Sequence, residues 1–240
     1  MSSLAFEKRD PSAKLSKIAS ASSLSLLLFL SQTAPMLGNP TGGAVVAGSA
    51  TIGNAGPTLT INQSSNQAII NWQQFSIATG ETTKFIVPSS LSATLNRVTG
   101  GNPSAIYGSL QSNGIVYLIN PSGIVVGPSG RIDTSGFLAS TLDVSNQQFL
   151  AGGDLTFAGA SGASIDNEGV VHASGGDVYL IANQVTNNGT LAAPQGTVGM
   201  AAGSEILFQQ GANQHLFVQA TPAGTTRALG VAPFAPPPPN

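Results

Sequence analysis

A repeat of twenty residues near the C-terminal end constrains this chain more than any other feature of its sequence. Within each copy, apolar positions alternate with small or polar ones, which is the period of a strand whose side chains face opposite ways in turn. Asn and Gly fall between the short strands, where we expect turns and φ > 0. The positions that align without a gap are Ile165, Asn167, Gly169, Val171, Ala173, Gly176, Val178 and Leu180, then Val185, Asn187, Gly189, Leu191, Ala193, Gly196, Val198 and Met200. A repeat of this length with two or three short strands predicts one coil of a parallel β-solenoid.

A solenoid coil needs stacked neighbours, because its strand edges and apolar side chains are otherwise left unpaired. A third copy with an offset of forty-six residues is expected at Gly123, Val125, Gly127, Gly130 and Ile132. The segment 136–162 is longer than one coil requires. It is expected to hold a rung near residues 154–158 and an excursion off the solenoid near residues 137–149. Residues 114–120 and 61–72 read as further strands split by turn residues.

The composition agrees with an all-β solenoid. Only 8% of the residues are charged, and 29 of the 240 are glycine, whereas an ordinary globular domain carries about 25% charged residues. Thr, Ser, Asn and Gln can cover the outer faces of a solenoid in place of charged side chains. The hydrophobic content of 41% argues against disorder. We therefore expect one folded domain over residues 39–220, followed by a Pro-rich tail over residues 221–240.

The N-terminal segment has the pattern of an export signal. Four basic residues, Lys8, Arg9, Lys14 and Lys17, precede an apolar run from residue 19 to residue 30. This predicts a signal peptide over residues 1–38, since the run is shorter than the roughly 20 residues that a membrane-spanning helix needs. The mature chain would then begin between residues 35 and 40 and carry four basic against eight acidic residues, a net charge of −4. This balance excludes a basic nucleic-acid-binding surface. The chain has no cysteine, so no disulfide would obstruct export of the unfolded chain.

Four segments now carry a resemblance to a known family. Residues 40–52 (PTGGAVVAGSATI), 61–77 (INQSSNQAIINWQQFSI), 96–114 (NRVTGGNPSAIYGSLQSNG) and 119–141 (INPSGIVVGPSGRIDTSGFLAST) occur in that order. Together they resemble the N-terminal two-partner secretion domain of filamentous haemagglutinin-type exoproteins. The resemblance implies a right-handed parallel β-helix that crosses the periplasm of a Gram-negative-type bacterium unfolded. It also implies recognition by a cognate outer-membrane β-barrel transporter with POTRA domains, release to the cell surface or the medium, and a relation to adhesins with an unknown receptor.

The same resemblance points to candidate site residues. The family motif Asn-Pro-Asn-Gly-Ile corresponds to Asn120, Pro121, Ser122, Gly123 and Ile124, with Ser at the third position. Pro and Ser favour a tight turn, and Gly accepts φ > 0, so the pentapeptide either serves in transporter recognition or only ends a rung. A second family motif, Asn-Pro-Asn-Leu, has no clear match, which leaves the transporter subclass open. Strand addition to a POTRA sheet edge would use Gly114, Ile115, Val116, Tyr117, Leu118 and Ile119.

Groups that could catalyse a reaction are scarce in the sequence. The two histidines, His172 and His215, lie forty-three residues apart, and His172 occupies an outward-facing position of its repeat. No His, Asp and Glu residues have metal-ligand spacing, and we predict neither a metal nor another cofactor. The alternative is a secreted β-helix that binds or cleaves a polysaccharide. It would need a carboxylate row on one solenoid face, for which the candidates are Asp133, Asp154, Asp166, Glu168 and Asp177. With few basic residues to accompany such a row, we predict that the chain is not an enzyme.

Overall fold

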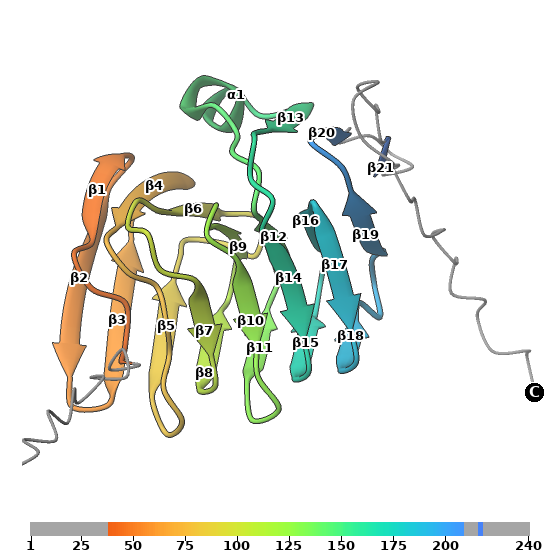
Figure 1. Ribbon diagram of the computed structural model, residues 1–240. Helices are drawn as coiled ribbons and strands as arrows, with labels where there is room; N and C mark the ends of the chain where they lie inside the picture. The colour runs from red at the N-terminus through yellow and green to blue at the C-terminus, as the bar shows by residue number, and fades with distance from the viewer. Residues whose placement is uncertain (1–37, 209–215, 218–240) are drawn as a thin grey trace, which may run out of the picture. The chain divides into compact units, whose positions relative to one another are not determined.

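The computed structural model describes residues 38–208 and 216–217. The expected signal peptide therefore lies outside the described residues except for Gly38, and the expected tail lies outside them altogether. Within the described part, almost every regular element is a strand, and the strands follow one another around stacked coils (Figure 1). The prediction of an all-β parallel β-helix with short excursions is confirmed.

Three sheets run along the solenoid. The covered sheet has the strand order β1 (Ala44–Ala47), β4 (Gln67–Trp72), β6 (Ala93–Val98), β9 (Ile115–Ile119), β12 (Gly136–Ser140), β16 (Val178–Ala182) and β19 (Val198–Ala202). The open sheet has the order β2 (Ala50–Ala55), β3 (Thr58–Gln63), β5 (Thr82–Ile86), β8 (Ser109–Ser112), β11 (Arg131–Thr134), β15 (Val170–Ala173) and β18 (Thr190–Ala192). The short sheet has the order β7 (Ser104–Ile106), β10 (Ile124–Val126), β14 (Ser164–Asn167) and β17 (Gln184–Asn187).

The strands of each sheet pair in parallel, except at the N-terminal end of the solenoid. There β1 pairs with β4 and β2 pairs with β3 in antiparallel fashion. These two strands therefore cap the edges of the first coil, which would otherwise offer unpaired backbone groups to another chain.

The twenty-residue repeat sets the register of the last two coils. Ile165 lies opposite Val185, and Leu180 lies opposite Met200, as the sequence predicts. The expected offset of forty-six residues for the third copy is wrong. Ile132 pairs with Val171 rather than with Val178, and the real offset between these coils is 39 to 41 residues. The ungapped alignment matched Gly123 with Gly169, but Gly123 precedes β10 whereas Gly169 precedes β15.

The repeated glycines are required for close stacking and not for left-handed turns. Gly169 and Gly189 do not have positive φ, contrary to the expectation. A Cβ atom on Gly169 would lie 2.4 Å from the carbonyl oxygen of Gly130, and one on Gly189 would lie 2.2 Å from that of Gly169. Each glycine therefore lets one coil approach the backbone of the coil below it.

The burial of the side chains explains why the sheets differ in sequence. Strands of the open sheet alternate between buried and exposed residues, as β3 does, because only their inner face meets the core. Every residue of β12 and β16 is buried, so these strands read as continuous apolar or small runs. Their inner side chains belong to the core of the solenoid, which includes Val116, Leu118 and Leu180. Their outer side chains, such as Leu138 and Tyr179, belong to a second apolar cluster.

An excursion between β12 and β14 covers the outer face of the covered sheet. It contains α1 (Asn146–Ala151), capped by the Ser145 side chain, and β13 (Leu155–Ala158). The strand β13 pairs antiparallel with β20 (Glu205–Phe208), which in turn pairs with β21 (Leu216–Phe217). Two expectations are thus wrong: residues 154–158 form no rung, and the excursion begins after the rung β12 instead of at residue 137. Phe137 is a core residue of the solenoid.

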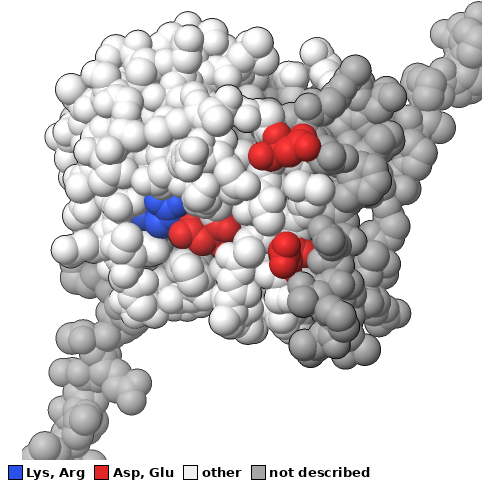
Figure 2. Space-filling model, turned by 90° about the horizontal axis from the view of Figure 1, so that it is seen from above, with Lys and Arg blue, Asp and Glu red and all other residues white. Residues whose placement is uncertain are grey.

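Polar contacts fasten this excursion to the first coils. The Arg97 guanidinium donates to Asp143 Oδ1 at 2.9 Å, to Asn146 Oδ1 at 2.8 Å and to the Val144 carbonyl at 2.7 Å. The Gln67 amide donates to the Phe149 carbonyl at 2.8 Å. Figure 2, which views this side from above, shows one basic group beside an acidic one on an otherwise mostly uncharged surface. No helix among the described residues is long and apolar enough to span a membrane.

Candidate functional site

The pentapeptide Asn120 to Ile124 forms the corner between the covered sheet and the short sheet. It follows β9 directly and leads into β10. The Asn120 side chain donates to the Asn102 carbonyl at 3.0 Å and to Ser104 Oγ at 2.9 Å, and it accepts a bond from Ser122 N at 2.9 Å. All of its polar atoms are used within the protein, and its exposed fraction is 0%.

The rest of the pentapeptide divides between solvent and core. Pro121 is exposed and Ser122 is half-buried, whereas Gly123 and Ile124 are buried. Gly123 has φ of 111°, and its amide donates to the Asn120 carbonyl at 3.0 Å. The prediction of a tight turn with a left-handed glycine is therefore confirmed for Gly123.

The segment expected to add to a transporter sheet lies in the middle of the covered sheet. The strand β9 pairs with β6 on one side and with β12 on the other. Val116 and Leu118 point into the solenoid core, and Tyr117 and Ile119 point into the outer cluster. No backbone edge of this strand is free in the folded protein, so strand addition would require the unfolded chain.

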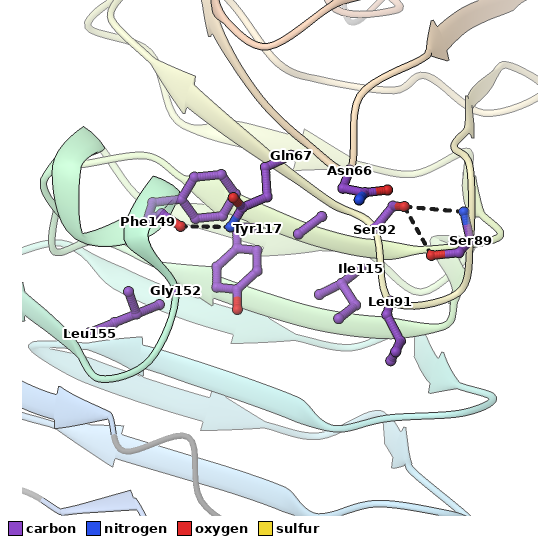
Figure 3. A pocket seen from close by; sticks show the side chains of 11 residues that line it. Asn66, Gln67, Ser89, Leu91, Ser92, Ile115, Tyr117, Phe149, Gly152 and Leu155 are labelled. Atoms are coloured by element: carbon purple, nitrogen blue, oxygen red, sulfur yellow. Dashed lines mark hydrogen bonds between the residues drawn. The ribbon is translucent and has the colours of Figure 1, made fainter.

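Two side chains of this segment also line a surface recess. Ile115 and Tyr117 form its floor, between the turn that carries Leu91 and the excursion that carries Phe149 (Figure 3). The recess has a volume of about 390 Å³, and a neighbouring one of about 350 Å³ shares the same floor. Leu91 is 82% exposed at its rim. At the rim Ser89 N donates to Ser92 Oγ at 3.1 Å, so polar groups surround the apolar side chains of the floor.

A buried tyrosine and a half-buried carboxyl group lie in the second recess. Burial raises the pKa of Asp177 above its ordinary value, although the backbone amide of Thr197 donates to this carboxylate at 2.7 Å and opposes the shift. Burial, with a further contribution from the charge of Asp177, raises the pKa of Tyr179 to about 12. Tyr179 belongs to the apolar cluster beneath the excursion.

The carboxylates proposed for a catalytic row are distributed over different parts of the molecule. Asp133 lies on the open sheet, Asp166 on the short sheet and Asp177 before β16 of the covered sheet. Asp154 belongs to the excursion, and Glu168 lies between β14 and β15. The described residues contain no group of three His, Asp or Glu side chains placed to hold a metal ion.

One cluster of titratable groups does form on the open sheet. His172 Nδ1 lies 3.4 Å from Asp133 Oδ1, and Arg131 pairs with the same carboxylate. His172 faces outward and is partly exposed, as its position in the repeat predicts. The second histidine, His215, lies outside the described residues. Sequence reasoning missed this cluster because the wrong offset of the third copy hid the pairing of Asp133 with His172.

The fold is a capped parallel β-helix with an excursion packed on one sheet and the pentapeptide at a corner. This arrangement is that of a β-helical exoprotein domain. The family model of the TPS secretion domain matches residues 37–233, so the chain belongs to the two-partner secretion domain family. Proteins of this family are secreted by Gram-negative bacteria with the help of an outer-membrane transporter.

Solved structures and curated relatives agree with this family. The chain resembles the HMW1 secretion domain from Haemophilus influenzae, with 36% identity, a TM-score of 0.69 and coverage of 77% of this chain and 50% of that one. The filamentous hemagglutinin secretion domain shares the fold, with 17% identity, a TM-score of 0.55 and coverage of 76% of this chain and 70% of that one.

Two relatives from Haemophilus influenzae are called heme/hemopexin-binding protein. One is 39% identical over 105 residues, or 44% of this chain. The other is 42% identical over 86 residues, or 36% of this chain. The matched segments span only 12% and 9% of those proteins.

Proposed function

We propose that this chain is the secretion module of a two-partner secretion exoprotein. In this proposal residues 1–38 direct export to the periplasm, and POTRA domains of a cognate outer-membrane β-barrel recognise the unfolded mature chain. The barrel then releases it to the cell surface or the medium, where the β-helix folds. Membership of the TPS secretion domain family supports the route. The likeness to filamentous haemagglutinin-type exoproteins supports a role in adhesion for the protein that the module exports.

The burial of Asn120 is the observation that supports recognition by the transporter before folding. Its side chain is fully buried, and two of its three polar contacts, those with Asn102 and Ser104, join two coils. The preceding strand β9 has both edges paired. A transporter can therefore read this region only before the β-helix forms. Recognition and folding would be mutually exclusive uses of the same residues.

The unfolded pentapeptide can still form a local turn that a transporter could recognise. The bond from Ser122 N to Asn120 Oδ1 and the bond from Gly123 N to the Asn120 carbonyl are both local. A turn of this kind can form transiently without the rest of the fold. The adjacent residues 115–119 are β-branched or aromatic apart from Leu118, which suits an extended strand. Such a strand can add to an exposed POTRA sheet edge through main-chain hydrogen bonds.

The proposal is tested with the double variant Asn120→Ala and Gly123→Ala. Binding of the urea-unfolded mature chain to isolated POTRA domains is measured after rapid dilution, so that the stability of the folded protein plays no part. We expect at least a tenfold loss of affinity, which corresponds to about 1.4 kcal/mol. Unchanged affinity would mean that the pentapeptide is only a structural turn.

The chain offers a matched control for this experiment. Residues 102–104 repeat the tripeptide Asn-Pro-Ser of residues 120–122. The double variant Gly101→Ala and Asn102→Ala likewise replaces one asparagine and one glycine at that second turn. It is expected to retain the affinity of the unaltered chain, because Ala105 stands where the family motif has glycine.

A further inference from the structure

The outer face of the open sheet carries an aligned row of polar side chains from four successive coils. Lys84 on β5 lies opposite Gln111 on β8, Gln111 lies opposite Asp133 on β11, and Asp133 lies opposite His172 on β15. We call these four residues, together with Arg131 beside Asp133, the polar row. The strands that carry them lie side by side along the solenoid (Figure 1).

The polar row concentrates the positive charge of an acidic protein. The described residues contain three basic and eight acidic side chains, a net charge of −5. Two of the three basic residues, Lys84 and Arg131, belong to the row, as does the one histidine in the described part. Of the eight acidic residues, the row includes only Asp133. The third basic residue, Arg97, is held by the excursion.

The charge of Lys84 is available to a ligand. Lys84 is exposed, and its ammonium group makes no ion pair or hydrogen bond with any described residue. It borders a recess of about 450 Å³ whose walls include Gln111, Asn113 and Asp133. Ile86 contributes an apolar surface to the same recess and is 44% exposed. An apolar surface surrounded by hydrogen-bonding groups suits a sugar ring, which presents both C–H and O–H groups.

The spacing of the row suits an extended polymer. Neighbouring strands lie about 4.8 Å apart, so the four side chains span roughly 14 Å along the axis. Successive sugars of an extended linear polysaccharide advance by about one strand spacing. A chain laid along the axis would therefore meet one side chain of the row per sugar. In contrast to the covered sheet, no helix or strand among the described residues packs on the outer face of the open sheet.

We propose that the polar row binds a linear acidic polysaccharide lengthwise along the solenoid. Lys84 would pair with carboxylates of the polymer, and Arg131, whose Nε and Nη2 already donate to Asp133, would donate to them from its remaining N–H groups. Gln111 would bond hydroxyl groups of the polymer, and Ile86 would contact a ring face. This surface exists only in the folded protein, so the proposal does not depend on how the unfolded chain is recognised by the transporter. It assigns an attachment function to the secretion domain itself.

The test uses the folded mature chain and fluorescently labelled polygalacturonate oligomers, which carry one carboxylate per sugar. Fluorescence anisotropy at low salt is expected to show saturable binding that weakens as salt is added. Cello-oligosaccharides of the same length, which are linear but neutral, should bind at least tenfold more weakly. Absence of binding by the polygalacturonate oligomers, or equal binding of the neutral ones, would overturn the proposal.

Two variants locate the site. The double variant Lys84→Gln and Arg131→Gln is expected to lower the affinity at least tenfold. The variant Lys84→Gln with Thr186→Lys keeps the net charge but moves the cation to the short sheet, and it should also bind more weakly than the unaltered chain. If either variant bound as well as the unaltered chain, the polar row would not be the site. The fluorescence of Trp72, the single tryptophan, reports that both variants are folded.

Discussion

The identity of single residues in this solenoid depends on the residues that they contact in the neighbouring coil. Asn167 donates to Asn187 Oδ1 at 2.7 Å, and these two residues occupy the same position of the repeat. Trp72 Nε1 donates to Asn96 Oδ1 at 2.9 Å on the neighbouring coil. These bonds satisfy polar groups inside or beside the core, where an unpaired group would destabilise the fold. Gly169 is retained for a related reason, because the carbonyl groups of Gly130 and Gly127 leave no room for a Cβ atom.

The variant Gly169→Ala is therefore expected to lower the free energy of unfolding by about 1–3 kcal/mol, the usual cost of overpacking. Urea unfolding followed by Trp72 fluorescence measures the change. Gly136→Ala is the matched control, because a Cβ atom there would meet its nearest neighbour, a side-chain atom of Ile115, at 3.4 Å. Equal destabilisation by both variants would contradict the stacking argument.

Tyr179 makes the stability depend on pH in the alkaline range. Its pKa is raised to about 12 in the folded protein, against about 10 in the unfolded chain. Between these values the unfolded chain releases a proton that the folded protein retains, so the stability falls as the pH rises from about 10 to about 12. Tyr179→Phe should lose less stability over this range, as measured by urea unfolding at several pH values. An identical pH dependence in both proteins would show that Tyr179 does not contribute.

At the level of elements, the sequence repeat predicted the stacked coils. It did not predict the contacts between segments far apart in the chain. Local alternation determines β14 to β19, because each strand pairs with one in the next coil. The strand β13 pairs instead with β20, about fifty residues further along the chain and antiparallel to it. Nothing in the local pattern of residues 154–158 distinguishes this partner from a stacked coil. The pentapeptide was located by its resemblance to a family motif, whereas the burial of Asn120 depends on contacts with residues 102–104 that the sequence does not reveal.

The attachment of the excursion depends mainly on Arg97. Replacing it in Arg97→Gln removes the ion pair with Asp143 and shortens the side chain that reaches the Val144 carbonyl. Because these contacts are partly exposed, we expect a local effect of about 1–2 kcal/mol. Hydrogen exchange should become faster over residues 142–158 and stay unchanged in the coils.

Arg131→Gln is the control for this measurement. Arg131 also forms an ion pair, but with Asp133 two residues away in the same strand. Its loss should leave the exchange of residues 142–158 unaffected. Faster exchange throughout the solenoid in Arg97→Gln would mean that the excursion and the coils open as one unit.

At the level of the whole molecule, the order of the coils follows the order of the chain. Each strand of the covered sheet from β6 to β16 pairs with its neighbours in the coils before and after it, so a chain that emerges from its N-terminal end can add one coil at a time. The antiparallel cap of β1 and β2 closes the first coil. Asn120 lies in the middle of this stack, and its partners at residues 102–104 belong to the coil before it. Folding of the central coils is therefore sufficient to bury Asn120.

This arrangement predicts that folding abolishes recognition. The urea-unfolded mature chain should bind isolated POTRA domains directly after dilution and lose this affinity at the rate at which Trp72 becomes buried. Trp72 is 1% exposed in the folded protein, and its fluorescence follows refolding without a label. The folded chain should bind at least a hundredfold more weakly, because exposing Asn120 would require the central coils to open. The Gly136→Ala variant, which is expected to fold normally, should behave in the same way. Equal binding of the folded and unfolded chains would show that the transporter reads an exposed surface, and Pro121 would then be the first residue of the pentapeptide to examine, because it alone is exposed.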